Sequence, residues 1–389
     1  MSNKLRIWLY CIMTMLFWFA NYAFVPYLSV YAASMTGSAA LIGIMLGAYG
    51  WAQLTLRVPV GIFSDRYNNR RLFVQAGCVI NVLSAIGFYF SPNIYWLIIS
   101  RALTGVTVSV WVAMSVLFSS YFERKDAVKA LTLLNACNLL GQMLASIVVM
   151  PVTAAYGIKS AFLLSTAVGM IPILISLTLK DKVLDRQPLR VSVLLAVGKT
   201  RWVLVISAMA ILCQTMTFAT TTGFTPQLAL RLGAQTSMLA WILLLSTMGG
   251  AFFSLLSSRL FVDRFGARNS LVVLLAVQAF TCLAQPLAPN LAILLTIVFI
   301  NGIARGTSIS LMLGLIIMPF PYEKQAAAMG FYQALYSLGI ILGPTIAGAV
   351  MQVSGLSAGF YVIGLIGLAA PLLGLIFIPD ERKTLPAIA

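Results

Sequence analysis

The chain has 389 residues, of which 61% are hydrophobic and only 9% are charged. Soluble domains are about half apolar and a quarter charged, so this composition is typical of a protein that lives in lipid. The net charge of +16 does not indicate nucleic-acid binding, because the basic residues are scattered through short segments and form no patch.

Apolar runs bounded by charges and turn residues predict twelve membrane-spanning helices, since each span needs about 20 apolar residues. The predicted helices of the first half cover 5–33, 39–62, 71–91, 94–120, 128–155 and 160–179. Those of the second half cover 201–230, 236–261, 269–287, 290–318, 324–353 and 357–378. We therefore expect an all-α integral membrane protein with a six-helix bundle in 1–179, a linker in 180–200, a second bundle in 201–380 and a tail in 381–389.

Lys and Arg fall almost entirely in the even-numbered loops, in the linker and near the two ends of the chain. Only Lys159 and Arg231 fall on the opposite side. Because cytoplasmic loops carry the excess of positive charge, this bias predicts that both termini, the linker and the tail are cytoplasmic. The short loops and the absence of a targeting segment favour a multi-pass protein of a prokaryotic plasma membrane.

Several landmarks repeat after about 200 residues, which indicates a duplicated six-helix unit with parallel halves. The charged stretch 61–71 returns in altered form at 259–268. Likewise the segment 22–28 resembles 222–228, and 122–124 resembles 322–324.

At these residues the sequence resembles the major facilitator superfamily over its whole length. The signature loop of that family, Gly-x-x-x-Asp-Arg-x-x-x-Arg-Arg/Lys between the second and third helices, is matched by Gly61, Asp65, Arg66, Arg70 and Arg71. Asn68 stands where the family usually has a second glycine, and Asn also tolerates a left-handed turn. The second copy keeps four residues of the signature, namely Asp263, Arg264, Gly266 and Arg268.

Two further elements support the resemblance. Arg101 is followed by Gly105, which matches an arginine and glycine that the family carries on its fourth helix. A Gly-x-x-x-Gly-Pro-x-x-x-Gly element, usually on the fifth helix of antiporters, stands here on the predicted eleventh helix as Gly339, Gly343, Pro344 and Gly348. These glycines and the proline are expected to allow close packing and a bend.

The resemblance implies two bundles that rock about a central site, in a monomer. It also implies that Asp65 latches the two halves on the inner side, against the positive end of the eleventh helix, and Asp263 is a candidate for the same role. The gating group we predict comprises Gly61, Asp65, Arg66, Arg70, Arg71, Arg57, Asp263, Arg264 and Arg268. The alternative is that these charges only fix topology.

Arg101 and Arg305 lie inside predicted spans, about 10 Å and 22 Å along their helices. Arginines at such depth usually face an aqueous path or a partner, and all nine acidic residues map to the cytoplasmic side. We predict that one or both arginines meet an anionic or strongly polar substrate. The alternative is hydrogen bonding to backbone carbonyls or to neighbouring amides.

Polar residues inside the spans are candidates for a central cavity, although such residues can equally hold helices together. The predicted cavity residues are Asn21, Arg101, Asn135, Asn138, Gln142, Gln214, Asn301, Arg305, Tyr332, Gln333 and Tyr336.

Neither an enzyme nor a cofactor site is predicted. The chain contains no histidine, its five cysteines lack metal-ligand spacing, and no nucleophile–base pair or phosphate-binding loop is visible. We therefore predict a secondary active transporter that moves a small solute, driven by a coupling proton or a counter-solute. An exporter of drugs or metabolites is the main hypothesis. The alternative is an importer or exchanger of small organic anions bound by Arg101 and Arg305.

Overall fold

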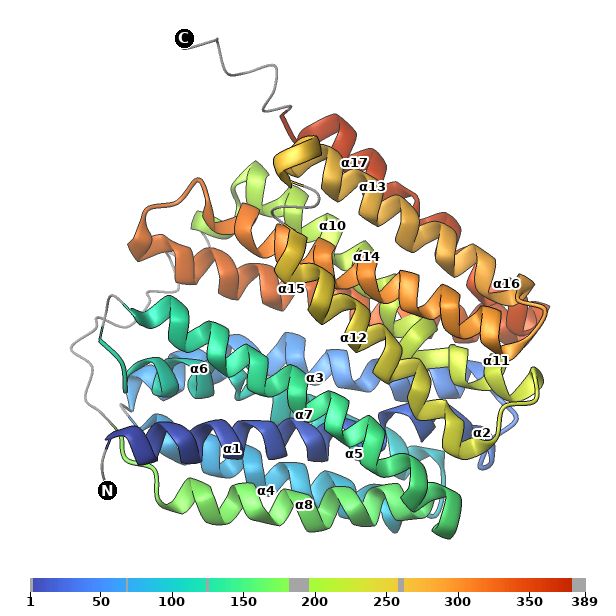
Figure 1. Cartoon of the computed structure of the whole chain (residues 1–389), viewed down its shortest axis with the longest axis horizontal. Coiled ribbons are helices and arrows are strands. Elements are labelled where there is room, and N and C mark those ends of the chain that lie inside the picture. The colour runs from blue at the N-terminus through green and yellow to red at the C-terminus, as the bar shows by residue number, and fades with distance from the viewer. Residues whose placement is uncertain (1–2, 68, 124–125, 182–195, 258–261, 380–389) are drawn as a thin grey trace. The chain divides into compact units, whose positions relative to one another are not determined.

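The computed structural model describes residues 3–67, 69–123, 126–181, 196–257 and 262–379 (Figure 1). Within these ranges the secondary structure is helical, and no strand occurs. Twelve helical stretches of the described chain are long and apolar enough to cross a membrane, and most begin and end within a few residues of the predicted spans. The predicted linker between 182 and 195 and the predicted tail at 381–389 lie outside the described residues.

The chain divides into two compact units. The first contains Met1–Gly37, Ala48–Leu189 and Gln235–Leu244, and the second contains Ser38–Gly47, Arg190–Ala234 and Leu245–Ala389. Each unit thus includes one short segment from the other half of the sequence. A division at the linker alone does not anticipate these two segments.

Helices of the first half pack mainly by α1 against α7 and α8, and by α4 against α5 and α8. They are α1 (Asn3–Tyr22), α2 (Leu28–Ala33), α3 (Ala39–Arg66), α4 (Arg70–Tyr89), α5 (Ile94–Ser109), α6 (Trp111–Ser119), α7 (Ala127–Tyr156) and α8 (Lys159–Leu177), with a 3₁₀ turn η1 (Val25–Tyr27).

Helices of the second half pack mainly by α10 against α15 and by α13 against α14 and α16. They are α10 (Arg201–Ala219), α11 (Thr225–Arg231), α12 (Ala240–Ser257), α13 (Asp263–Ala284), α14 (Leu291–Ile317), α15 (Tyr322–Ser354), α16 (Leu356–Gly367) and α17 (Ala369–Phe377), with short turns η3 (Thr220–Phe224), η4 (Thr236–Leu239) and η6 (Gln285–Leu287).

The first and seventh spans are broken helices rather than continuous ones. The break after α1 is a 3₁₀ turn that contains Pro26, and the break after α10 is a π-helical turn followed by Pro226 at the start of α11. Proline lacks a backbone N–H and so removes a helical hydrogen bond. The repeated segments 22–28 and 222–228 therefore mark equivalent breaks in the two halves.

Glycines allow close helix packing in each unit. A Cβ added at Gly141 of α7 would collide with the carbonyl oxygen of Met15 in α1. In the second unit, a Cβ at Gly339 or Gly343 of α15 would collide with the backbone of α10 at Ile211 or Thr215. The close packing predicted for the glycine element is thus observed at these two positions. Pro344 lies inside the uninterrupted helix α15, and the predicted bend stays a prediction.

Buried amides join the first and third spans of each half in the same way. Asn81 of α4 donates to the carbonyl of Phe17 in α1 at 3.0 Å, and Gln278 of α13 donates to the carbonyl of Cys213 in α10 at 3.1 Å. These amides are 2% and 0% exposed, so each bond is shielded from solvent. The duplication therefore extends from loop sequences to buried contacts.

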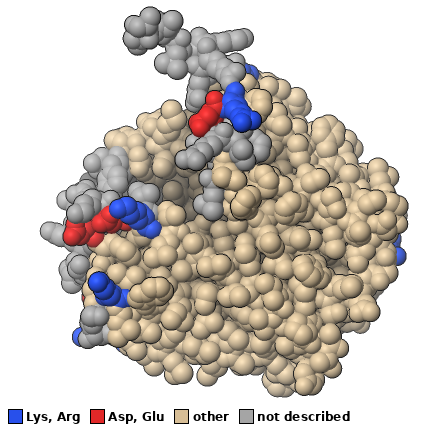
Figure 2. All heavy atoms as spheres, viewed as in Figure 1, with Lys and Arg blue, Asp and Glu red and all other residues tan. Residues whose placement is uncertain are grey.

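Charged side chains are sparse on the molecular surface. In Figure 2 the Lys, Arg, Asp and Glu atoms visible on one face lie near its edges, and a broad uncharged area separates them. Exposed large hydrophobic side chains such as Trp8, Leu83 and Phe252 belong to the spans. Such a surface is suited to lipid rather than to water.

Candidate functional site

The first copy of the charged loop is held at the start of α4. The side chain of Asn69 accepts from the backbone N–H of Leu72 at 3.2 Å. The Asp181 carboxylate accepts from the backbone N–H of Arg71 at 3.1 and 3.3 Å. Both acceptors satisfy N–H groups that have no partner within a helix. The Nη2 atom of Arg71 also donates to the carbonyl of Leu177, at the end of α8, at 2.8 Å.

The second copy makes the matching contact at the start of α13. Arg268 Nη2 donates to the carbonyl of Leu375 in α17 at 2.5 Å. Gly266 has φ 78° and ψ 159°, a conformation that favours glycine, and it interrupts the helical path just before Arg268. In both halves an arginine therefore ties the third span to the end of the sixth, where a cation is favoured by the helix dipole.

The remaining gating candidates differ in exposure. Arg70 is buried at the start of α4, Arg66 is exposed, and Asp263 and Arg264 are exposed at the start of α13. The side chain of Asp65 lies outside the described residues.

Gly61 and Arg57 lie farther along α3. A Cβ at Gly61 would lie 3.5 Å from Val112 of α6, which is ordinary contact. Arg57 is 4% exposed and donates to Gln53 Oε1 at 3.1 Å. Arg57 is therefore shielded from solvent.

Tyr121 is a structural residue near this loop that the sequence reasoning did not identify. Its hydroxyl donates to the carbonyl of Lys180 at 2.9 Å, and its own carbonyl accepts from Asn3 at 2.9 Å. The Arg6 guanidinium lies 5.5 Å from the centre of its ring. Burial raises the pKa of Tyr121 to about 12. Its position directly before the repeated segment 122–124 was the available signal.

Arg101 is 3% exposed and lies within the first unit. Its Cζ lies 4.4 Å from the centre of the Tyr49 ring, and its Nη1 lies 3.5 Å from Thr104 Oγ1. A cation over an aromatic face is stabilised by the ring quadrupole. The Nε atom has no hydrogen-bond partner among the residues that the structure describes.

Asn21 and Asn301 lie in polar networks between helices. Asn21 Nδ2 donates to Asn81 Oδ1 at 3.4 Å. Asn301 is fully buried, donates to Thr281 Oγ1 at 2.7 Å and accepts from Thr221 Oγ1 at 3.4 Å. These contacts correspond to the helix-joining alternative stated for such residues.

The three amide side chains of α7 differ in exposure and in hydrogen bonding. Gln142 Nε2 donates to Asn138 Oδ1 at 2.7 Å, one turn apart on the same face. Gln142 is buried, Asn138 is half-buried and Asn135 is exposed on the surface of the first unit. The structure thus pairs two of the three amides.

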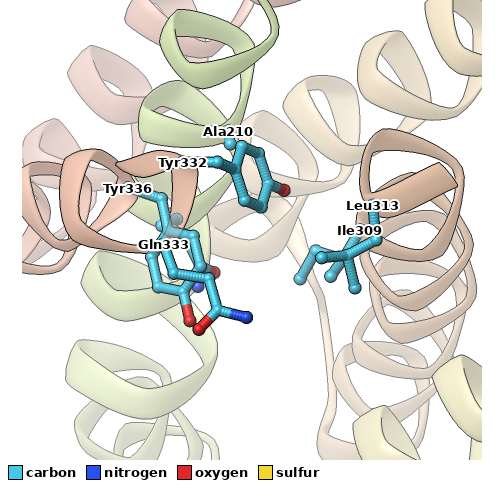
Figure 3. Close-up of a pocket in the computed structure, with 7 residues that line it drawn as sticks. Ala210, Ile309, Leu313, Tyr332, Gln333 and Tyr336 are labelled. Carbon is cyan, nitrogen blue, oxygen red and sulfur yellow. The ribbon is translucent and has the colours of Figure 1, made fainter. Parts of the chain in front are cut away.

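The described part of the second unit contains a cavity of about 180 Å³, formed between α10, α14 and α15 (Figure 3). Its lining combines two tyrosines, two glutamines and three aliphatic residues, and none of the described lining residues is charged. They are Ala210, Gln214, Ile309, Leu313, Tyr332, Gln333 and Tyr336. Four of the predicted cavity residues are therefore brought together here.

Arg305 lies one turn before the cavity wall on α14. It is separated by four residues from Ile309 and by eight from Leu313, so the three share one helix face. The arginine is half-buried, and its Nε atom is buried without a partner among the described residues. The three aliphatic lining residues, Ala210, Ile309 and Leu313, were not predicted. Their helical spacing from Gln214 and Arg305 on the same helices could have identified them.

The model of the Major Facilitator Superfamily matches residues 10–207 and 206–389, which together cover almost the whole chain. The chain belongs to the major facilitator superfamily. Its fold is therefore all-α with twelve membrane-spanning helices, as predicted, and it is a multi-pass membrane protein of a family of transporters rather than enzymes.

Individual relatives show what this member is similar to. It is 25% identical over 327 residues to the "Multi-drug resistance efflux pump PmrA" of Streptococcus pneumoniae, over 78% of each chain. It is 27% identical over 168 residues to an "Uncharacterized transporter" of Buchnera aphidicola, a match that spans only 42% of that protein. A crystal structure of the nucleoside transporter NupG superposes with a TM-score of 0.78 at 14% identity, over 96% of this chain and 98% of that one. The last similarity concerns the fold alone.

Proposed function

We propose that this transporter exports small drugs or metabolites by alternating access. The uncharged lining of the cavity in the second unit is the main support, because tyrosine, glutamine and aliphatic side chains suit an amphipathic solute better than an ion. The similarity to a protein described as a multidrug efflux pump agrees with this direction of transport. The distribution of Lys and Arg supports a plasma-membrane location with both termini in the cytoplasm.

The test is accumulation of a lipophilic dye by inside-out vesicles that contain the purified protein. We expect uptake into the vesicles, driven by a proton gradient or by a preloaded counter-solute. Tyr336→Ala should reduce uptake severalfold, because it removes one aromatic wall of the cavity. Tyr95→Ala is the matched control, since Tyr95 is 63% exposed on α5. Equal uptake by wild type, Tyr336→Ala and empty vesicles would contradict the proposal.

The second candidate function is import or exchange of small organic anions. The buried Nε atom of Arg305, beside the cavity and without a described partner, favours it. Arg101 is the other candidate contact, although the Tyr49 ring covers it. Stabilisation of the purified protein by organic anions, lost in Arg305→Met and Arg101→Met, would support this function over the first.

We further propose that Asp65 and Asp263 act as conformational latches, with the neighbouring arginines as their support. The two arginine contacts to helix ends agree with this, because they fix the position of each loop. In Asp65→Asn and Asp263→Asn we expect a changed transport rate and a changed reactivity of a cysteine introduced on the inner side. Asp126→Asn is the control, since Asp126 pairs with Lys129 at 3.0 Å. Unchanged rate and reactivity in both loop variants would exclude the latch.

A further inference from the structure

The cavity between α10, α14 and α15 has the size of a single small ring system. Its volume is about 180 Å³, and an apolar protein cavity of about 150 Å³ is known to accept benzene. A one-ring or two-ring solute therefore fits, whereas a larger solute has to extend beyond the cavity. The cavity is consequently a subsite, in which one part of a solute is bound.

The walls of this subsite are arranged for a flat group. Tyr332 and Tyr336 lie on one side, with ring centres 5.5 Å apart and ring planes at 82°. Ile309 and Leu313 lie on the other side, and Figure 3 shows the space between the two pairs. The perpendicular tyrosines present both an edge and a face, and planar rings pack favourably against either. Aliphatic side chains opposite them provide the apolar contact.

The polarity of the subsite comes from glutamine rather than from charge. Gln214 is 9% exposed and lines the cavity, and its buried Oε1 atom accepts no hydrogen bond from the residues that the structure describes. The terminal torsion of a glutamine is broad, so its oxygen turns toward a donor at little cost. A buried acceptor without a donor is rare in proteins. The carboxamide of Gln214 is thus available to a donor on a bound molecule.

Charged rings fit this subsite poorly. None of its described lining residues carries a carboxylate to balance a cation. Arg305, the charge closest along α14, lies one turn outside the lining. A cation taken from water into such a lining would lose its hydration without a partner of opposite charge, and an anion would have only Arg305, outside the lining.

We infer that this cavity is the subsite for an uncharged planar ring bearing an N–H or O–H donor, and that Gln214 is the residue that selects for the donor. The inference rests on the proposed transport function and assigns a substrate class to it. Gln333 also lines the cavity and is half-buried, so its amide is a second hydrogen-bonding group for the edge of the bound ring.

Two isomeric probes test the inference directly. 3-Methylindole and 1-methylindole have the same size and no charge, but only the first retains an N–H donor. We expect the purified wild-type protein to bind 3-methylindole about tenfold more tightly, as one hydrogen bond to a shielded acceptor would give. In Gln214→Met the ratio of dissociation constants should fall to about one, mainly through weaker binding of 3-methylindole. Gln75→Met should keep the wild-type ratio, since Gln75 bonds to Ser176 in the first unit.

The outcomes separate this inference from the proposed export function. Equal binding of the two isomers by wild type, or a ratio unchanged in Gln214→Met, would overturn the selecting role of Gln214. Absence of binding for both isomers, together with intact dye transport, would overturn the subsite and leave export standing. A preserved tenfold ratio without any dye transport would support the subsite while export fails.

Discussion

In the first unit, Gly141 of α7 lies against the Met15 carbonyl, Asn81 donates to the Phe17 carbonyl and Arg71 donates to the Leu177 carbonyl. The second unit repeats all three contacts about 200 residues later. There Gly339 lies against the Ile211 carbonyl, and Gln278 and Arg268 donate to the carbonyls of Cys213 and Leu375. In every case the partner is a backbone carbonyl. Because a carbonyl exists whatever the side chain is, such contacts survive while the surrounding side chains diverge.

The side chains that we propose to contact solute do not repeat in this way. In the first unit Arg101 is covered by the Tyr49 ring, and the position about 200 residues later, Val298, is a buried apolar residue. In the second unit Gln214, Tyr332 and Tyr336 border a cavity. The comparison indicates that the duplicated half supplied the same packing scaffold twice, whereas the residues proposed to contact solute differ between the two copies.

The largest expected effect that tests this comparison is on the glycine contacts. Gly141→Ala and Gly339→Ala should each lower the free energy of unfolding by about 1–3 kcal/mol, because the added Cβ forces two backbones apart. Thermal unfolding in detergent measures the loss. Gly330→Ala is the control, since a Cβ there meets nothing within 4 Å and replacing glycine in a helix is stabilising. Similar melting temperatures for all three variants would contradict the equivalent packing role of the two glycine contacts.

An intermediate effect is expected for the amide contacts. Asn81→Leu and Gln278→Met should each cost about 1–2 kcal/mol, since each removes two hydrogen bonds between buried groups. The cost should be similar in the two units, as measured by thermal unfolding. Asn135→Leu, at an exposed position of α7, should change stability little. A large loss in one unit alone would show that the repeated geometry has unequal importance.

The smallest effect is expected for the arginines at the helix ends. Arg71→Met and Arg268→Met should each cost about 0.3–1 kcal/mol, the range for a cation at a partly exposed helix end. Added salt should reduce the difference from wild type, because exposed charges are screened. Lys4→Met, at an exposed residue of α1, serves as the control. A difference that salt does not change would indicate a packing role for the arginine stems instead.

Much of the fold was predictable from the sequence, since bilayer thickness fixes the length of an apolar span. The twelve spans followed from this pattern, and the residues of the charged loop carried the resemblance to the family that the chain belongs to. The positions of the helix breaks could not be predicted from this pattern. Pro26 and Pro226 lie at breaks, whereas Pro59, Pro151 and Pro344 lie inside uninterrupted helices. Whether a proline breaks a membrane helix depends on whether neighbouring groups satisfy the freed carbonyls, and those neighbours come from distant parts of the chain.

For the polar residues inside the spans, too, the sequence determined one part of the outcome and the tertiary structure the other. Sequence alone determined that Asn21, Asn301 and Gln214 lie in apolar helices, where each amide requires a partner. Only the tertiary structure decided the partners. Asn21 and Asn301 meet groups on neighbouring helices, while Gln214 faces a cavity. The rotation of each helix about its axis sets this outcome, and it is fixed by close contacts such as that of Gly339 with α10 rather than by the polar residue itself.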